Sequence, residues 1–242
     1  MANAKTLKSR LASGEFDARL KEVYLSDKAV EDQKKRDAVI IDEFVRLFGD
    51  NDSIKLFSAP GRTEVGGNHT DHNHGKVLAA SVDLDTVAAA AKRDDGIIVE
   101  KSFKFDALEV DISDLEVHTE EFGKSSGLIR GMCAGFKERG YNIGGFNAAS
   151  MSRVLSGSGL SSSAAYEVLI GTILNHLYND GKVSPVEVAK IAQYAENKYF
   201  GKPCGLLDQT ASSVGSFITI DFKDPSRPII NKVDFDFASC GH

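Results

Sequence analysis

The chain has 242 residues, of which 42% are hydrophobic and 26% charged, an ordinary composition for a globular protein with one large domain or two small ones. A net charge of −6, with Lys and Arg scattered along the chain, argues against a nucleic-acid or anionic-membrane surface, since either needs a concentrated basic face. The N-terminus has no apolar signal core, and no apolar run approaches the roughly 20 residues of a membrane helix. We therefore expect a cytoplasmic protein that acts on a small molecule, with no nucleic-acid or membrane partner.

Three cysteines, Cys133, Cys204 and Cys240, are odd in number, widely spaced and without a C-x-x-C pair. This pattern favours reduced thiols over a disulfide framework or a zinc site. We expect the cysteines to be structural.

The first quarter of the chain predicts helix followed by strand and loop. Residues 1–50 are charged and carry apolar residues at helical spacing up to Gly49, which is placed as a C-terminal cap. One or two helices are expected there. Residues 54–59 are typical of a strand, and residues 60–75, rich in Gly, Asn, His and Asp, predict a long loop that is too polar for the core.

The middle of the chain is expected to mix strands and helices. Residues 76–82 and 85–92 are strand-like, and the turn signal Asp94-Asp95-Gly96 predicts that residues 97–101 return as a hairpin partner. The pattern further predicts a strand at 107–112, a helix at 128–139 and a strand at 145–155.

The last third begins with the most regular helix of the chain, which has an apolar face over residues 164–177 and is expected to end near Asp180-Gly181. A second helix, 184–200, starts with a capping box in which Ser184 is the N-cap, followed by Pro and, at the third helical position, Glu. Strands are expected at 216–222 and 229–237. No repeat, low-complexity segment or linker is visible.

The segment Ser156–Ala165, S-G-S-G-L-S-S-S-A-A, connects a predicted strand to the most regular helix. Glycines let backbone N–H groups approach a phosphate, and the helix N-terminus adds the positive end of its dipole. Serine hydroxyls can also ligate Mg²⁺. The segment indicates a phosphate cradle of a nucleotide-using kinase, and a flexible loop with a serine helix cap remains the alternative.

Two other nucleotide motifs are missing from the chain. There is no G-x-x-x-x-G-K-S/T of a Walker P-loop and no H-R-D with D-F-G of a protein kinase. These classes are therefore disfavoured.

Three ordered stretches carry a family resemblance. G-L-S-S-S-A-A resembles the second motif of the GHMP kinases, the superfamily named for galactokinase, homoserine kinase, mevalonate kinase and phosphomevalonate kinase. Residues 59–75, A-P-G-R-T-E-V-G-G-N-H-T-D-H-N-H-G, are similar to the galactokinase signature in which P-G-R is followed by G-E-H-T-D-Y-N. Ala195-Glu196 and residues 200–209, F-G-K-P-C-G-L-L-D-Q, resemble the galactokinase stretch A-E-H and F-x-G-x-P-C-G-I-M-D-Q.

This resemblance implies an α+β fold, the GHMP-kinase N-terminal domain of ribosomal protein S5 domain 2-like type, with a mixed or mostly antiparallel sheet and packed helices. It divides the chain into an N-terminal helical segment (1–50), the GHMP domain (51–222) and the start of a C-terminal domain (223–242). It also implies an enzyme, a sugar 1-kinase that transfers the γ-phosphoryl of ATP, with Mg²⁺, to the anomeric hydroxyl of galactose or a related sugar. Oligomeric state is left open.

The resemblance assigns roles residue by residue. Asp208 matches the aspartate that accepts or orients the hydroxyl proton, and Arg62 the arginine that pairs with it. Glu196 and Ser163, with Ser162 as a further candidate, match the magnesium ligands. Sugar contacts are implied for Asn68, His69, Asp71 and Gly205, and nucleotide contacts for Gly157, Ser158, Gly159, Leu160, Ser161, Ser162, Ser163 and Ala164.

Each of these residues alone also has an ordinary interpretation. Arg62 could be a salt-bridging arginine, Glu196 a solvated helix residue and Asp208 a helix cap. His69, His72 and His74 with Asp71 could hold a transition metal. The order of all of them within the matching stretches favours the kinase roles.

The chain departs from the family pattern at the sugar stretch. The family's G-E-H is Gly67-Asn68-His69 here, the tyrosine of D-Y-N is His72, and T-E-V-G-G replaces V-N-L-I-G. Asn68 still donates and accepts hydrogen bonds but loses the charge of the glutamate. Another acceptor, such as N-acetylgalactosamine, arabinose or galacturonate, therefore remains open.

A second departure is length. Galactokinases have a second domain with a third glycine-rich motif, which the 242 residues do not show, so we expect a fragment with little or no turnover by itself. A non-catalytic sugar-sensing regulator of the same fold is the other alternative, disfavoured by the intact serines, Arg62 and Asp208.

Overall fold

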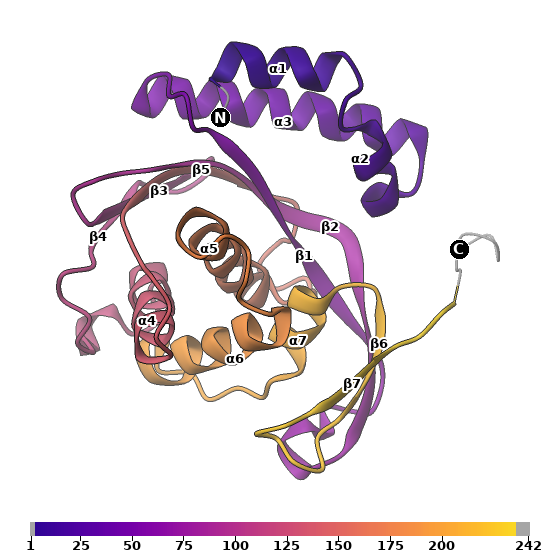
Figure 1. The fold of residues 1–242 in the computed structure, drawn as a ribbon. Coiled ribbons are helices and arrows are strands. Elements are labelled where there is room, and N and C mark those ends of the chain that lie inside the picture. The colour runs from indigo at the N-terminus through magenta and orange to yellow at the C-terminus, as the bar shows by residue number, and fades with distance from the viewer. Residues whose placement is uncertain (1–2, 236–242) are drawn as a thin grey trace.

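The computed structural model describes residues 3–235, and a seven-stranded sheet with helices on both faces organises them (Figure 1). The N-terminal helices cover one face of the sheet, and the later helices cover the other. The helices are α1 (Ala4–Ala12), α2 (Asp17–Tyr24), α3 (Asp27–Phe48), α4 (Ser125–Glu138), α5 (Ser162–Tyr178), α6 (Pro185–Ala195) and α7 (Leu207–Val214), with short turns η1 (Thr70–Asn73), η2 (Thr119–Glu121) and the π-helical η3 (Glu196–Phe200).

The sheet runs in the order β4-β3-β5-β2-β6-β7, and β1 pairs with β2 outside this path. Among the described residues, β3 and β5 form the parallel pair and the other pairings are antiparallel. The predicted mixed sheet with packed helices is confirmed. The strands are β1 (Lys55–Gly66), β2 (Lys76–Lys92), β3 (Ile97–Ser102), β4 (Leu108–Asp111), β5 (Phe146–Ser152), β6 (Phe217–Asp221) and β7 (Ile229–Lys232).

The longest strand, β2, corrects two sequence predictions. It is continuous over 17 residues, whereas the sequence predicted separate strands at 76–82 and 85–92. β1 pairs with β2 on both sides of a bulge near Gly61. The backbone of β2 therefore stays extended between the two segments that the sequence predicted as separate strands. The predicted hairpin with residues 97–101 is also wrong, because β5 lies between β2 and β3 and pairs with both.

β1 was expected to end near Ala59, but it continues through Pro60 and Gly61 to Gly66. One edge of β1 follows β2, and the other meets the cradle: the Arg62 N–H donates to the Leu160 carbonyl at 3.0 Å. A Cβ on Gly61 would lie 2.9 Å from the same carbonyl oxygen. The polar signature therefore begins as a strand, and glycine lets that strand approach the loop.

The N-terminal segment folds as three helices where one or two were predicted, and α3 ends at Gly49 as expected. Ile40, Ile41 and Phe44 of α3 are buried against small side chains of the sheet, including Ala89 and Ala149. Small residues on the strands let the helix pack closely, and each buried aliphatic or aromatic side chain contributes roughly 1.5–3 kcal/mol.

A buried polar cluster also fastens these helices to the sheet. Asp85 of β2 is 2% exposed, and it accepts hydrogen bonds from Tyr24, Arg36 and Ser58. Asp37 lies beside this cluster and accepts from Gln33 at 2.6 Å. The orientation of α2 and α3 is thus specified by charge pairing in addition to apolar burial.

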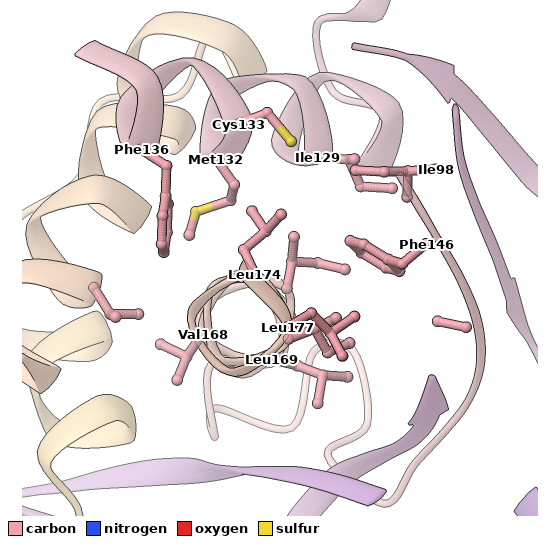
Figure 2. Packing of buried hydrophobic residues seen from close by; sticks show 14 of the residues in the cluster. Ile98, Ile129, Met132, Cys133, Phe136, Phe146, Val168, Leu169, Leu174 and Leu177 are labelled. Atoms are coloured by element: carbon pink, nitrogen blue, oxygen red, sulfur yellow. The ribbon is translucent and has the colours of Figure 1, made fainter. Parts of the chain in front are cut away.

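The larger apolar core lies on the opposite face of the sheet, around α5 (Figure 2). α5 is buried almost all round because its sequence is nearly continuous in apolar residues. The helix predicted from the apolar face at 164–177 is confirmed, and it ends at Tyr178, close to the expected Asp180-Gly181. The labelled side chains of Figure 2 come from α4, α5 and the sheet: Ile98, Ile129, Met132, Cys133, Phe136, Phe146, Val168, Leu169, Leu174 and Leu177.

Glycines bring α4 close to α6. A Cβ on Gly131 would lie 2.8 Å from the Ala195 Cα, and one on Gly135 would lie 2.7 Å from Ile191 Cγ2. The predicted helix at 184–200 divides into α6 and the π-helical η3, which ends at Gly201 as expected. The Ser184 side chain accepts from the Glu187 N–H at 3.2 Å, which confirms the N-cap.

Three smaller findings complete the fold. No helix in residues 3–235 is both long and apolar enough to cross a membrane. Cys133 and Cys204 are free thiols, while Cys240 and the end of the strand predicted at 229–237 lie outside the described residues. Burial raises the pKa of the Cys133 thiol to about 12, so it is an unreactive core residue.

Candidate active site

The centre of the site is an ion pair between β1 and α7. Arg62 Nε lies 2.6 Å from Asp208 Oδ1, and Arg62 Nη2 lies 2.6 Å from Asp208 Oδ2. Arg62 is buried, while the Asp208 side chain keeps 30% of its surface exposed. A guanidinium and a carboxylate joined by two parallel contacts are a rigid, specific pair. Asp208 is thereby held in one orientation with an open side.

The helix that carries Asp208 was not predicted from the sequence. α7 has eight residues and begins directly before Asp208, with Leu206 as its N-cap residue. A run this short gives little periodic signal. Placing a carboxylate in the first turn also suits the helix dipole.

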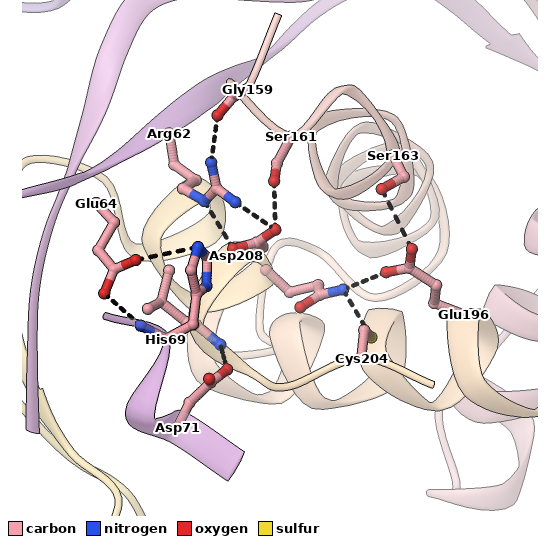
Figure 3. Close-up of polar contacts among 12 residues, drawn as sticks. Arg62, Glu64, His69, Asp71, Gly159, Ser161, Ser163, Glu196, Cys204 and Asp208 are labelled. Carbon is pink, nitrogen blue, oxygen red and sulfur yellow. Dashed lines mark hydrogen bonds and ion pairs between the residues drawn. The ribbon is translucent and has the colours of Figure 1, made fainter. Parts of the chain in front are cut away.

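The serine-rich cradle is tied to this pair. Ser161 Oγ donates to Asp208 Oδ2, and Arg62 Nη1 donates to the Gly159 carbonyl at 2.7 Å (Figure 3). Ser161 precedes α5, but its side chain makes no capping hydrogen bond. The structure therefore gives no support to the alternative that this segment is a loop with a serine helix cap.

The backbone of the cradle has the conformation that glycine permits. Gly157 and Gly159 have φ of 76° and 77°, and nothing lies within 4 Å of the position where a Cβ would stand. Residues 156–159 are exposed, whereas Ala164 is fully buried. Because the first N–H groups of a helix lack intrahelical partners, the first turn of α5 suits an anion.

A second cluster of oxygen donors surrounds Glu196 at the start of η3. Ser163 Oγ lies 3.3 Å from Glu196 Oε1, and Lys202 Nζ lies 3.1 Å from the same oxygen. Glu196 is 2% exposed. The buried Glu196 carboxylate thus has a serine hydroxyl and an ammonium group beside it, an environment that suits a cation. The Ser163 hydroxyl and the Glu196 carboxylate are hard oxygen ligands, as Mg²⁺ prefers, so they fit that ion.

The sequence did not identify two buried neighbours of Glu196. Gln209 Nε2 donates to Glu196 Oε2 at 2.8 Å and lies 3.3 Å from Glu167 Oε2. Glu167 is completely buried, and burial, with Glu196 nearby, raises its pKa well above the usual range. The sequence signal for Glu167 is its position as a charged residue among the apolar core positions of α5.

The predicted sugar residues divide into two groups. Asp71 in η1 is buried, and its Oδ2 accepts from the Leu207 N–H at 3.2 Å. A Cβ on Gly205 would lie 1.7 Å from the same oxygen, so only glycine fits there. Asp71 and Gly205 are therefore brought together beside the start of α7, which carries Asp208.

Asn68 and His69 lie at the outer edge of the site. Both are exposed and have φ of 50°. The Asn68 side chain makes no hydrogen bond within the described part of the chain, while His69 is held by Glu64, a residue that the sequence analysis did not select. Asn68 thus stays apart from the paired groups.

The transition-metal alternative at His69, His72 and His74 finds no support. Within residues 3–235, no three His, Cys, Asp or Glu side chains come close enough together to hold a metal ion. His72 Nε2 lies 3.8 Å from Asp71 Oδ1, which is beyond hydrogen-bond distance.

Two family models match the chain at these elements. The galactokinase galactose-binding signature covers residues 42–92, and the GHMP kinase N-terminal domain covers residues 127–216. The chain matches the N-terminal part of the galactokinase family of GHMP kinases. The family and the fold class predicted from the sequence are both confirmed.

Curated relatives agree with this assignment. A galactokinase from Clostridium beijerinckii is 37% identical over 179 residues, covering 73% of this chain and 46% of that protein. A galactokinase from Streptomyces coelicolor is 36% identical over 191 residues, covering 77% of this chain and 48% of the relative. The chain thus spans about half the length of the curated relatives that it matches.

Solved structures show the same fold. Lactococcus lactis galactokinase complexed with galactose superposes with a TM-score of 0.73 at 31% identity, covering 83% of this chain and 52% of that one. Methanococcus jannaschii mevalonate kinase superposes with a TM-score of 0.62 at 15% identity, covering 77% of this chain and 58% of that one. The second comparison shows that this fold is shared with a mevalonate kinase of low sequence identity.

Proposed function

We propose that this chain supplies the N-terminal half of a sugar 1-kinase, which transfers the γ-phosphoryl of ATP to the anomeric hydroxyl of galactose or a close relative. The observation that carries the proposal is the Arg62–Asp208 pair, joined to the cradle through Ser161 and Gly159. It brings a candidate base, a cation and a phosphate-binding loop into contact.

In this proposal Asp208 accepts or orients the proton of the acceptor hydroxyl. A carboxylate has about four lone-pair sites, and the contacts with Arg62 and Ser161 leave part of Asp208 exposed. Arg62 fixes the carboxylate and presents positive charge beside the cradle. Positioning and charge neutralisation are the main demands of phosphoryl transfer.

Ser163 and Glu196 would hold Mg²⁺, with Ser162 as a possible further hydroxyl. Bound there, the ion would neutralise charge on the transferring phosphates. Lys202 already places positive charge on Glu196, and Coulombic attraction to that residue raises the pKa of Lys202. The same carboxylate would therefore exchange an ammonium partner for the ion, and Gln209 would keep its other oxygen fixed.

Asp71 and Gly205 would bind the sugar. Asp71 Oδ1 is buried without a hydrogen-bond partner in the described structure, and such a group favours a ligand that donates to it. Gly205 would allow the backbone to approach the ring. We also propose that turnover needs the second half that the relatives contain. In this proposal residues 223–242 are the start of that further domain.

The proposal is tested with the protein expressed from its complete reading frame and with residues 1–242 alone. ATP, Mg²⁺ and a panel of galactose, N-acetylgalactosamine, arabinose and galacturonate are assayed for sugar 1-phosphate. We expect the complete protein to phosphorylate one of these sugars and residues 1–242 to show little turnover. ATP binding without any sugar-dependent transfer would favour a non-catalytic regulator. The change at Asn68 is the reason to include acceptors other than galactose.

A further inference from the structure

Glu64 is an acidic side chain on the same face of β1 as Arg62. The β1–β2 register runs without interruption through Arg62, Thr63 and Glu64, opposite Ser81, Ala80 and Ala79. Residues two apart on a regular strand point to one face of the sheet. Figure 3 shows Glu64 and His69 beside Arg62 and Asp208, with Ser163 and Glu196 on the other side of that pair.

Both oxygens of Glu64 are fixed by one residue. Glu64 Oε1 accepts from the His69 backbone N–H at 2.8 Å, and Glu64 Oε2 lies 3.1 Å from His69 Nε2. The Glu64 side chain is only 12% exposed, while that of His69 is 58% exposed. A carboxylate held at both oxygens is preorganised, and each oxygen keeps a lone pair for another donor.

The acidic group has moved relative to the family pattern. Position 68 is glutamate in G-E-H and asparagine here, while position 64 is asparagine in V-N-L-I-G and glutamate here. The stretch therefore keeps a glutamate besides Asp71, but this glutamate stands on β1 and not in the loop. Asn68 is exposed and unpaired in the described structure, so it does not replace that carboxylate.

We propose that Glu64, together with the His69 ring that it orients, determines sugar specificity. Glu64 accepts a hydrogen bond from a hydroxyl of the substrate sugar other than the anomeric one. The inference rests on the proposed kinase function. It narrows the acceptor to a neutral aldose, because a sugar carboxylate would meet the negative charge of Glu64. Galacturonate is thereby disfavoured among the candidate acceptors.

A purely structural role is the competing explanation. His69 has a left-handed backbone, which is uncommon for a residue other than glycine, and Glu64 could serve only to stabilise it. That role would alter folding or the activity on all sugars equally. A specificity role alters the ratio between two sugars, and this ratio does not depend on the fraction of protein that is folded.

The experiment uses the complete protein and measures kcat/KM for galactose, its 2-, 3-, 4- and 6-deoxy derivatives, and galacturonate. Glu64→Gln removes the charge with little change of shape, and Glu64→Asn introduces the residue of the family pattern. Glu109→Gln, an exposed glutamate on β4, is the matched control. Thermal unfolding accompanies each variant.

We expect one deoxy sugar to be a poorer substrate than galactose by about tenfold or more, as for loss of a hydrogen bond to a charged group. This penalty should shrink several-fold in Glu64→Gln and Glu64→Asn and stay unchanged in Glu109→Gln. Transfer with identical sugar ratios in wild type and both Glu64 variants would overturn the inference alone, as would galacturonate being preferred over galactose. Absence of transfer to all of these sugars and also to N-acetylgalactosamine and arabinose would instead remove the proposed function and the inference with it.

Discussion

Arg62 and Asp208 are 146 residues apart in sequence and form two contacts of 2.6 Å between β1 and the first turn of α7. Ser161, from the loop before α5, completes the group by donating to the same carboxylate. Three separate elements therefore meet at one aspartate. If this meeting point is where a sugar hydroxyl reacts, removing its charge should affect the chemical step more than nucleotide binding.

Asp208→Asn tests this in the complete protein. The amide cannot accept the proton, so we expect turnover to fall by about 10²- to 10⁴-fold while the dissociation constant for an ATP analogue changes little. A steady-state assay and calorimetric titration measure the two quantities. Asp106→Asn, at an exposed aspartate, is the control. Turnover close to wild type would remove Asp208 from its proposed role.

Gly205→Ala tests the close approach to Asp71. A methyl group would stand 1.7 Å from Asp71 Oδ2, so Asp71 or the loop before α7 must shift, and such overpacking costs about 1–3 kcal/mol. We expect a lower unfolding midpoint and a sugar KM raised at least severalfold. Gly66→Ala is the matched control, since nothing lies within 4 Å of a Cβ there. Equal behaviour of the two variants would contradict the packing argument.

Glu167 offers a test of the buried carboxyl beside Glu196. Burial, with Glu196 nearby, raises its pKa well above the usual range, so folding favours the neutral carboxyl, and Glu167→Gln, which cannot ionise, should not lower the free energy of unfolding. Glu167→Ala should cost about 2–4 kcal/mol, because it leaves a cavity next to Gln209. Urea unfolding at pH 6 and pH 9 measures both.

The sign of the pH effect on Glu167 follows from linkage. A folded-state pKa raised above the unfolded value stabilises the protonated native state, and this contribution is lost as the pH rises through the folded value. The Gln variant has no proton to lose. It should therefore gain stability relative to wild type as the pH rises from 6 to 9, and a relative loss over that range would contradict the raised pKa of Glu167.

Asp37 predicts a pH dependence near neutrality. Burial raises its pKa from 3.8 to about 7, against the opposing effects of Gln33 and Arg36. The native state then holds this proton more tightly than the unfolded chain, so its contribution to stability declines from about pH 4 to about pH 7. Asp37→Asn removes that decline, and we expect the variant to gain about 3 kcal/mol relative to wild type between pH 4.5 and pH 8.

Thermal unfolding across this pH range checks the prediction. Asp32→Asn, an exposed residue of the same helix α3, should leave the pH profile unchanged. Parallel profiles for wild type and Asp37→Asn would show that Asp37 does not titrate differently in the two states.

Most helices and the kinase family could be predicted from the sequence because their signals are local. The capping box at Ser184 and the glycine after α3 fix helix ends within a few residues. The order of the strands could not be predicted, since β5 enters between β2 and β3 from 44 residues beyond β3. Nothing in residues 85–101 encodes the arrival of a third strand.

The candidate site shows the same division. Arg62, Ser161 and Asp208 were selected because they lie in recognisable stretches, and the structure brings them into contact. Glu64 was not selected because it departs from the family pattern, and its role depends on the contact with His69. The roles of Lys202 and Gln209 likewise follow only from their contacts with Glu196, which the sequence does not show.

Gly131 of α4 affects the candidate site although it contributes no side chain to it. Gly131 stands against Ala195, and Ala195 directly precedes Glu196, the proposed magnesium ligand. The space between this carboxylate and Ser163 is therefore set partly by a residue without a side chain, on a helix that supplies none of the proposed ligands. A methyl group at Gly131 would displace α6, so a substitution there would be observed as weaker metal affinity. Substitution at Gly131 is thus expected to be as restricted as substitution at the ligands themselves.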